Sequence, residues 1–228
     1  METGIDVKAP VSEVPPLALY GAALAAFSAG HRRPGWLIRD ADGRVCPLDL
    51  RRWCSARTAG DDGLLNRCDG PTLDIGCGPG RLLAGLAARN IPALGIDVAS
   101  AAVRLAAARG AVVLHRSVFD SLPGTGGWSH ALLADGNLGI GGNPLCLLRR
   151  VGELLAADGS LLCELDPPGT TAGPVRLRIE SPLGQTSAWF PWARTPADEF
   201  APLAAAAGLR CVEQWRDGPR WFASVGTR

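Results

Sequence analysis

The chain from Pro71 onward carries the pattern that most constrains its fold. Short apolar segments, which we expect to be strands, alternate there with segments rich in Ala and Leu, which we expect to be helices. Such alternation is typical of a parallel sheet with helices on both faces, and it predicts an α/β, doubly wound domain. The five expected strands are Thr72–Ile75, Ala93–Ile96, Ala111–Leu114, His130–Ala134 and Ser160–Leu165.

Local signals place helices between these strands. We expect helices over Arg81–Arg89 and over Ala101–Arg109, the second with Ser100 as its N-cap. A third helix is expected to begin after Asn143, with Pro144 in its first turn, and to end at Gly159.

The segment after the fifth strand predicts an insertion and a closing hairpin. Within residues 170–194, apolar and charged side chains alternate through Val175 and Ile179, which indicates a half-buried strand of a β-hairpin. The run Thr195–Asp198 resembles a capping box that opens another helix. The chain is expected to close with an antiparallel hairpin, Leu209–Trp215 and Arg220–Val225.

Residues 1–70 are expected to form a helical cap, or lid, that precedes the domain of residues 71–228. Residues 17–30 are apolar and could pass for a signal peptide. However, acidic residues precede them and positive charges follow, which is the reverse of the secretory pattern, and the segment is too short for a membrane span. We therefore expect a helix there, and a second one near Asp61–Arg67.

Charge and cysteine content narrow the class of partner. Lys and Arg number 23 against 22 Asp and Glu, so the formal charge is +1, which disfavours a nucleic-acid or membrane-surface partner. The seven cysteines include no Cys-x-x-Cys pair and predict a reduced, cytoplasmic protein without a metal site of that kind.

The most informative segment is Asp74-Ile75-Gly76-Cys77-Gly78-Pro79-Gly80-Arg81, where a strand meets three alternate glycines and then a helix. A dinucleotide fold requires its third glycine at the position of Arg81. Asp74 would also repel a pyrophosphate, whereas it can pair with an ammonium group. A helix start suits a carboxylate. An amino acid satisfies both features, and a nicotinamide oxidoreductase is disfavoured.

Two further acids follow the next strands. Asp97 ends the second strand, where a carboxylate can accept hydrogen bonds from a ribose diol. Asp120 follows the third strand, where it can accept one from an adenine amino group. Amino acid, ribose and adenine in this order describe S-adenosylmethionine.

This pattern resembles the class I S-adenosylmethionine-dependent methyltransferases over about residues 71–228. The resemblance implies a seven-stranded sheet with the final hairpin beside the fifth strand and the last strand antiparallel, and a ligand between the first and fourth strands. It implies S-adenosyl-L-methionine as cofactor. The cofactor-binding residues that it implies are Asp74, Gly76, Cys77, Gly78, Gly80, Asp97, Val98, Phe119, Asp120 and Asp135.

The methyl acceptor leaves a fainter trace, because methyl transfer needs little beyond alignment of the nucleophile and sometimes a base. Asp135 and Asn137, after the fourth strand, are candidates to hold the acceptor, with a helix connection as the equal alternative. His31 and Tyr20 are candidate bases on or beside the first helix, although a structural role is the commoner one for each. Aromatic residues, among them Trp53, Phe190 and Trp192, are candidates for an acceptor pocket, a core or a subunit interface.

We therefore expect a cytoplasmic monomer or homodimer that methylates a hydroxyl, amine or thiol of a small metabolite, as in bacterial secondary metabolism. Two alternatives stay open, namely an RNA or protein methyltransferase and a non-catalytic S-adenosylmethionine-binding protein. No metal is expected. Asp135 and Asp166 end neighbouring strands, but Pro167 stands where a third ligand would be needed.

Overall fold

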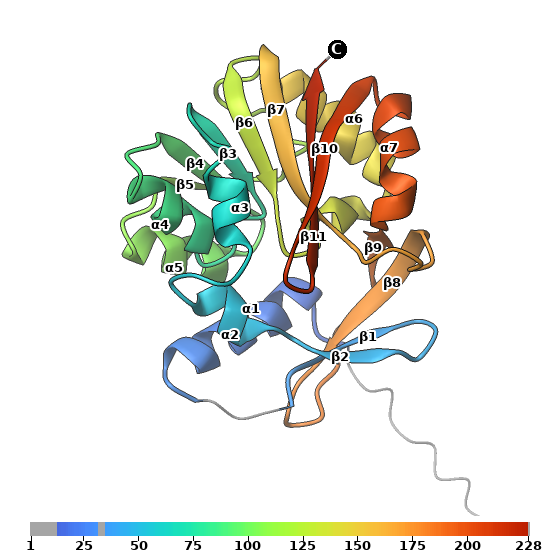
Figure 1. Ribbon diagram of the computed structural model, residues 1–228. Helices are drawn as coiled ribbons and strands as arrows, with labels where there is room; N and C mark the ends of the chain where they lie inside the picture. Colours follow the sequence, from blue (N-terminus) through green and yellow to red (C-terminus); the bar gives the residue numbers. More distant parts are fainter. Residues whose placement is uncertain (1–12, 32–34, 228) are drawn as a thin grey trace, which may run out of the picture.

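A computed structural model describes residues 13–31 and 35–227 (Figure 1). Its main sheet has seven strands in the order β10-β11-β7-β6-β3-β4-β5. The strands of this sheet are β3 (Thr72–Ile75), β4 (Ala93–Asp97), β5 (Val113–His115), β6 (Trp128–Leu133), β7 (Leu155–Leu165), β10 (Leu209–Asp217) and β11 (Arg220–Thr227).

Strand direction follows the sheet predicted from the family resemblance. The pairs β3–β4, β3–β6, β4–β5 and β6–β7 are all parallel. β11 lies between β7 and β10 and is antiparallel to both. The expected α/β class, the mostly parallel seven-stranded sheet and the antiparallel final strand are thus confirmed.

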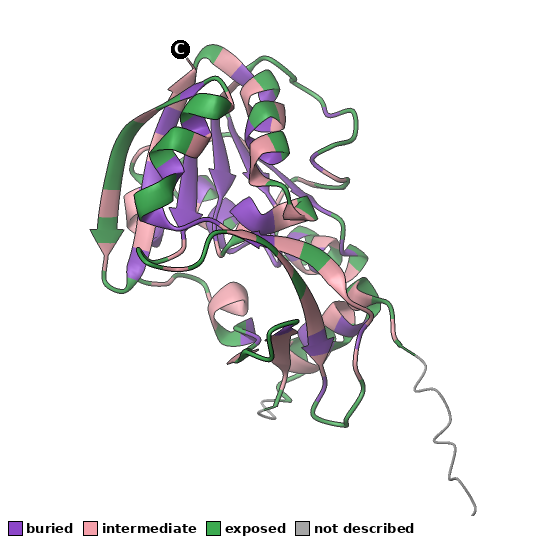
Figure 2. Cartoon of the chain, turned by 90° about the vertical axis from the view of Figure 1, so that its right-hand side faces the viewer, coloured by how far each residue is buried: buried purple, intermediate pink, exposed green. Residues whose placement is uncertain are grey.

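Helices cover both faces of the sheet because its central strands are apolar on both sides. Along β6, Ala131 and Leu133 belong to one buried cluster and Leu132 to another. The first cluster includes residues of α6 and α7, and the second includes residues of α3 and α4. Figure 2 shows these strands as buried. The helices of this part are α3 (Asp61–Leu65), α4 (Arg81–Ala87), α5 (Ser100–Ala108), a 3-10 segment η1 (Asn137–Gly142), α6 (Pro144–Leu154) and α7 (Ala197–Ala206).

A second layer lies below the sheet in Figure 1, and we call it the cap, meaning the described residues of 13–54 together with 173–194. It contains a four-stranded sheet in the order β2-β1-β8-β9, so two segments far apart in sequence share one sheet. Its elements are α1 (Pro16–Ser28), β1 (Leu37–Asp40), β2 (Val45–Pro47), α2 (Leu50–Cys54), β8 (Gly173–Glu180) and β9 (Phe190–Arg194).

The cap differs from the sequence expectation in one respect. Its N-terminal part is not purely helical, because β1 and β2 form a hairpin and β1 pairs antiparallel with β8 of the insertion. Both strands are too short to show a clear alternation. The expected insertion hairpin is present as β8 and β9.

Several helix boundaries also differ; for example, α4 ends at Ala87 rather than at Arg89. Ser100 is the first residue of α5 rather than its cap, and Ala99 precedes it without a side-chain cap. Asn143 caps α6 as expected, but the helix ends at Leu154, and Gly159 lies within β7. Pro196, not Thr195, is the N-cap of α7, with no side-chain hydrogen bond. In the part of the chain that is described, no helix is long and apolar enough to cross a membrane.

Candidate functional site

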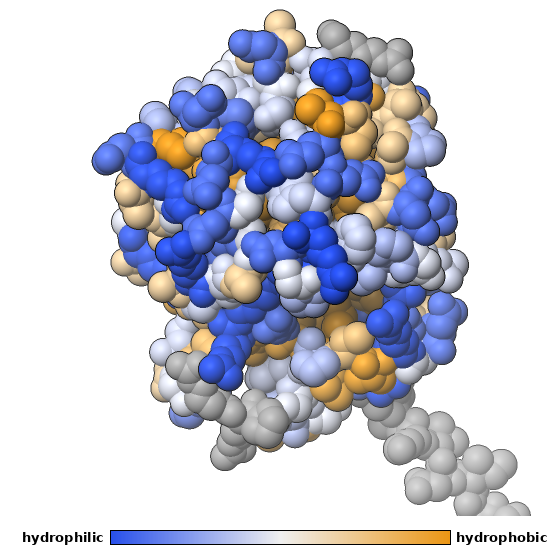
Figure 3. Space-filling view, viewed as in Figure 1, coloured by the Kyte–Doolittle hydropathy of each residue, from blue (hydrophilic) through white to orange (hydrophobic). Residues whose placement is uncertain are grey.

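A cavity of about 500 Å³ lies between the carboxyl ends of the parallel strands and the cap. The main domain contributes the ends of β3, β4 and β6 and the segments that follow them. The cap contributes apolar side chains from α1, β1, α2, β8 and β9. Figure 3 shows apolar surface in the recess between the two layers. The volume is in the range of cavities that bind small molecules.

The three glycines after β3 have three different roles. Gly76, at φ +69°, leaves room for Asn137, since a Cβ there would lie 2.6 Å from the Asn137 amide nitrogen. Gly78, at φ +54°, lines the cavity, and a Cβ there would lie 3.7 Å from the Tyr20 hydroxyl. Gly80 packs against Ala106 of α5 and does not line the cavity. Of the three, Gly78 has the most open space toward a ligand.

Asp74 is buried where β3 ends, and it lines the cavity. Its Oδ2 accepts no hydrogen bond from any residue that the structure describes. Burial raises the pKa of this carboxyl to about 7, with Asp135 and Asp97 adding to the rise against the opposing charge of Arg81. A buried carboxylate oxygen without a donor is costly, so this position fits a ligand that brings a donor, such as an ammonium group.

Asp97, the last residue of β4, also lines the cavity. Its Oδ2 accepts a hydrogen bond from the Gly78 amide at 2.9 Å, and its Oδ1 accepts one from the Ala99 amide at 2.7 Å. Burial raises its pKa, and these two donors oppose the rise. The carboxylate thus holds the glycine loop in place, and each oxygen retains a lone pair for a ligand hydroxyl.

The candidates for the adenine end are only partly brought together. Val98 is 45% exposed and lines the cavity. Phe119 and Asp120 do not line it, and the Asp120 carboxylate accepts a hydrogen bond from the Ser117 amide instead. The lining residues at this point are Arg116, Ser117 and Val118, one turn earlier than the sequence suggested.

Asp135 and Asn137 line the cavity after β6, but both are already engaged. The Asn137 side-chain amide donates to the carbonyls of Ile75 and Gly76 at 3.0 and 2.9 Å, which fastens this loop to the glycine loop. Asp135, at φ +56°, forms ion pairs with Arg81 and with Arg52, the latter at 2.8 Å. Burial raises the Asp135 pKa, and both arginines oppose that rise. Asn137 thus has a structural role here, whereas Asp135 Oδ1 accepts no hydrogen bond from any residue that the structure describes.

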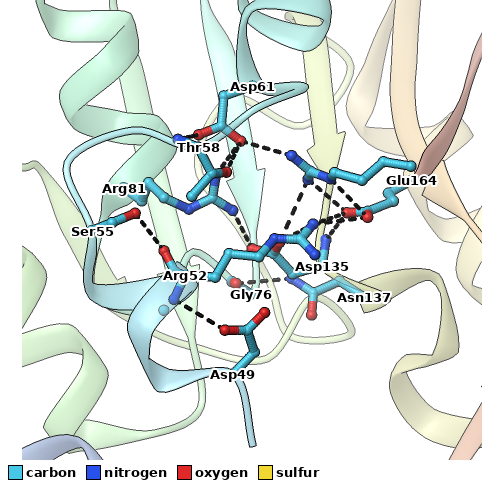
Figure 4. Close-up of polar contacts among 12 residues, drawn as sticks. Asp49, Arg52, Ser55, Thr58, Asp61, Gly76, Arg81, Asp135, Asn137 and Glu164 are labelled. Atoms are coloured by element: carbon cyan, nitrogen blue, oxygen red, sulfur yellow. Dashed lines mark hydrogen bonds and ion pairs between the residues drawn. The ribbon is translucent and has the colours of Figure 1, made fainter. Parts of the chain in front are cut away.

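A buried ionic network, shown in part in Figure 4, surrounds Asp135. Arg52 of α2 and Arg220 of β11 both donate to Glu164 of β7. Arg81 pairs with Asp61 at the start of α3 and with Asp135. The network therefore joins the cap, the sheet and the loop after β6. Sequence analysis missed it, although a glutamate in the apolar run of β7 was a visible signal.

The two candidate bases, Tyr20 and His31, differ in their position relative to the cavity. Tyr20 lines the cavity, and burial, with help from Asp97, raises the pKa of its phenol well above 10. His31 is exposed beyond the end of α1 and does not line the cavity. The structure thus does not bring His31 to the site.

Asp166 accepts a hydrogen bond from the Thr195 amide at 2.7 Å, and no cluster of three metal-ligating side chains occurs in residues 13–31 and 35–227.

Comparison with known proteins identifies the fold. No protein-family model matches the sequence, and no curated protein matches it either. A methyltransferase from Bacteroides fragilis, solved with S-adenosyl-L-homocysteine, superposes with a TM-score of 0.76 at 19% identity, over 94% of this chain and 97% of that one. The chain thus has the fold of S-adenosylmethionine-dependent methyltransferases.

Two further solved structures are of methyltransferases whose acceptor is named. The 1,6-didemethyltoxoflavin-N1-methyltransferase of Burkholderia thailandensis matches with a TM-score of 0.58 at 17% identity, over 97% of this chain and 93% of that one. CalS10, an amino pentose methyltransferase from Micromonospora echinaspora, matches with a TM-score of 0.55 at 18% identity, over 74% of this chain and 90% of that one. At these identities the likeness concerns the fold.

Proposed function

We propose that this protein transfers a methyl group from S-adenosyl-L-methionine to a small-molecule acceptor in the cytoplasm. The observation that carries the proposal is the buried Asp74 carboxylate, whose Oδ2 lacks a donor and borders a cavity that also contains Asp97. An amino acid ammonium and a ribose are the groups that two such carboxylates would bind together.

Different residues of the cavity would bind different parts of the cofactor. Asp74 would accept from the ammonium group, Asp97 from the ribose hydroxyls, and Val98 with Val118 would contact the adenine. When bound, S-adenosylmethionine supplies an electrophilic methyl on a sulfonium. The cap closes the far side of the cavity, so its apolar side chains exclude water from the acceptor.

The solved structures support a small acceptor. The Burkholderia protein is a 1,6-didemethyltoxoflavin-N1-methyltransferase, and the Micromonospora protein is an amino pentose methyltransferase. A cavity of about 500 Å³, closed by the cap, suits a metabolite better than a macromolecular chain. No disulfide links the cysteines, and Cys68, Cys77 and Cys163 are buried thiols, as suits a reducing compartment.

Two measurements test the proposal. Calorimetry with S-adenosyl-L-homocysteine should show one site per chain, and binding should weaken in Asp74→Asn. Incubation with methyl-labelled cofactor and a metabolite extract should move the label into a small molecule. Absence of binding would overturn the proposal, whereas binding without transfer would point to a sensor, and transfer into RNA or protein would point to a macromolecular substrate.

A further inference from the structure

The cavity wall contributed by the cap is almost entirely apolar. Its lining side chains include Ile38, Leu48, Trp53, Leu177, Phe190 and Trp192. They belong to five separate elements or loops of the cap, and most of them belong to the buried apolar cluster of the cap or are packed against it. The part of an acceptor that lies against this wall therefore gains by being apolar.

Five charged side chains of the cap sheet pair with one another. Glu180 accepts from Arg39 at 2.7 Å and from Arg178 at 3.0 Å. Asp40 forms an ion pair with Arg194. None of these five residues lines the cavity. An anionic acceptor would thus lose its hydration against this wall without meeting a cationic partner from the cap sheet, which is unfavourable.

The wall also favours a flat ligand. Two aromatic pairs border the cavity, Phe190 with Trp192 and Tyr20 with Trp53. Their ring centroids are 6.2 and 5.9 Å apart, and both pairs are edge-to-face, at 90° and 80°. All four rings border the cavity, and aromatic rings pack well against another flat ring.

The chemistry of the wall bears on the nucleophile. Tyr20 is the one ionisable side chain that the described part of the cap places at the cavity, and its raised pKa keeps it a neutral phenol, which can donate a hydrogen bond but is a poor base. Asp135, from the main domain, is held by two arginines. A hydroxyl nucleophile needs a base to take its proton, whereas a nitrogen with a free lone pair does not.

We propose that the cap wall binds a flat, uncharged nitrogen heterocycle and that a ring nitrogen accepts the methyl group. This inference rests on the proposed function. The nitrogen lone pair forms the new N–C bond while the C–S bond breaks and its electron pair returns to sulfur. In a ring such as benzimidazole, the second nitrogen then releases its proton to water. The aromatic faces stabilise the positive charge that develops on the ring.

The first experiment compares neutral and charged probes on the whole protein, with and without saturating S-adenosyl-L-homocysteine. Benzimidazole, quinoline and isoquinoline are the neutral probes, and benzimidazole-5-carboxylate and quinoline-6-carboxylate are the charged ones. Saturation-transfer NMR should show at least tenfold tighter binding of one or more neutral probes. Failure of all three neutral probes to bind, or equal binding of the carboxylates, would overturn the inference.

The second experiment uses two matched variants of β8. Leu177 and Val175 are both half-buried and lie on the same face of the strand, but Leu177 lines this cavity and Val175 does not. Leu177→Asp should weaken neutral-probe binding at least tenfold, and Val175→Asp should leave it within about twofold. Equal effects in the two variants would contradict the assignment. If Leu177→Asp fails to fold, the comparison of probes on the unaltered protein decides.

The third experiment tests the atom methylated. With labelled cofactor, benzimidazole should accept methyl and 2-naphthol, a flat hydroxyl compound, should accept at least tenfold less. Preferential methylation of 2-naphthol would overturn the nitrogen assignment. Loss of S-adenosyl-L-homocysteine binding alone would instead refute the proposed function, because probe binding is also measured without that ligand.

Discussion

Arg220 of β11 and Glu164 of β7 form a buried, two-hydrogen-bond ion pair across adjacent antiparallel strands, with Nε–Oε1 at 2.9 Å and Nη2–Oε2 at 2.8 Å. Arg220 also donates to the Ala59 carbonyl at 2.7 Å. Burial opposes the ionisation of Glu164, but Arg220 and Arg52 hold its pKa below its usual value. β11 is thereby joined to the buried ionic network around Asp135.

Arg220→Met should therefore be strongly destabilising. Removing Arg220 takes its two hydrogen bonds from the buried Glu164 carboxylate and leaves Arg52 as the neighbouring cation, which should cost up to about 3–5 kcal/mol of the free energy of unfolding. Arg57→Ala, which breaks the exposed pair with Asp62, should cost under about 1 kcal/mol. Urea unfolding measures the free energy of unfolding of both variants.

The stability that the ion pair contributes should also depend on pH. Because the pKa of Glu164 is lowered, the contribution of its carboxylate to the free energy of unfolding is present above its unfolded pKa of about 4.3 and is lost as pH falls. The difference between Arg220→Met and the unaltered protein should shrink accordingly in acid, and a constant difference would contradict the assignment.

Asp74→Asn should change stability and binding in opposite directions. The raised pKa of Asp74 means that its ionisation destabilises the ligand-free fold progressively as pH rises from about 4 to about 7. At pH about 8 the asparagine variant should therefore unfold with a free energy roughly 2–4 kcal/mol higher, and near pH about 4 the advantage should disappear. Thermal and chemical unfolding at both pH values check this.

The same carboxylate predicts a pH dependence of ligand binding. The ionised form pairs with an ammonium group, so the affinity of the unaltered protein for S-adenosyl-L-homocysteine should rise as pH rises through about 7 and then level off. Asp74→Asn should bind about 10–150-fold more weakly above that pH, from the loss of one charge-assisted hydrogen bond, and show no such rise. A pH-dependent affinity retained in the variant would place the ammonium group elsewhere.

Asp97→Ala should weaken S-adenosyl-L-homocysteine binding by about 1.5–3 kcal/mol for each hydrogen bond that is lost to the ribose. The comparison variant is Asp120→Ala, another acid that follows a strand. Its carboxylate does not line the cavity but accepts a hydrogen bond from the amide of Ser117, which does, so this variant should lose clearly less affinity than Asp97→Ala. Calorimetry on both variants decides, and equal losses would show that the adenine end extends to Asp120.

Asn137→Ala should affect both stability and ligand affinity. It removes two hydrogen bonds from a half-buried amide that holds the glycine loop, which costs about 1–3 kcal/mol of the free energy of unfolding. Asn143→Ala removes the cap of α6 and should cost about 1 kcal/mol without changing ligand affinity. If both variants bind S-adenosyl-L-homocysteine equally well, Asn137 has no role in shaping the loop.

The sequence predicted the sheet well because its signals are local. β3 spans Thr72–Ile75, as expected, since the apolar or β-forming residues Thr72, Leu73 and Ile75 precede a glycine that must turn. Asp97 ends β4 where a strand-end acid was expected, because parallel strands deliver their carboxyl ends to one edge. Both acids reach the cavity for that reason.

What the sequence could not predict depends on distant partners. Asn137 looked like an acceptor residue because its neighbours do not reveal that two carbonyls after β3 lie within reach of its side chain. From the sequence, Arg81 indicated only that the glycine motif is not that of a dinucleotide-binding fold. In the structure it is the buried ion-pair partner of Asp61 and Asp135. Such contacts join residues separated by 20 or more positions, and periodicity carries no information about them.

The pairing of β1 with β8 has a consequence for biosynthesis. Arg39 of β1 lies opposite Arg178 of β8, although the two residues are far apart in the sequence. The hairpin of β1 and β2 is therefore synthesised long before β8, the strand with which it pairs. Until then the open edge of Leu37–Asp40 is exposed in the nascent chain, and the floor of the binding chamber is missing. The main sheet can begin to assemble first. The cavity closes only after the hairpin of residues 173–194 pairs with β1.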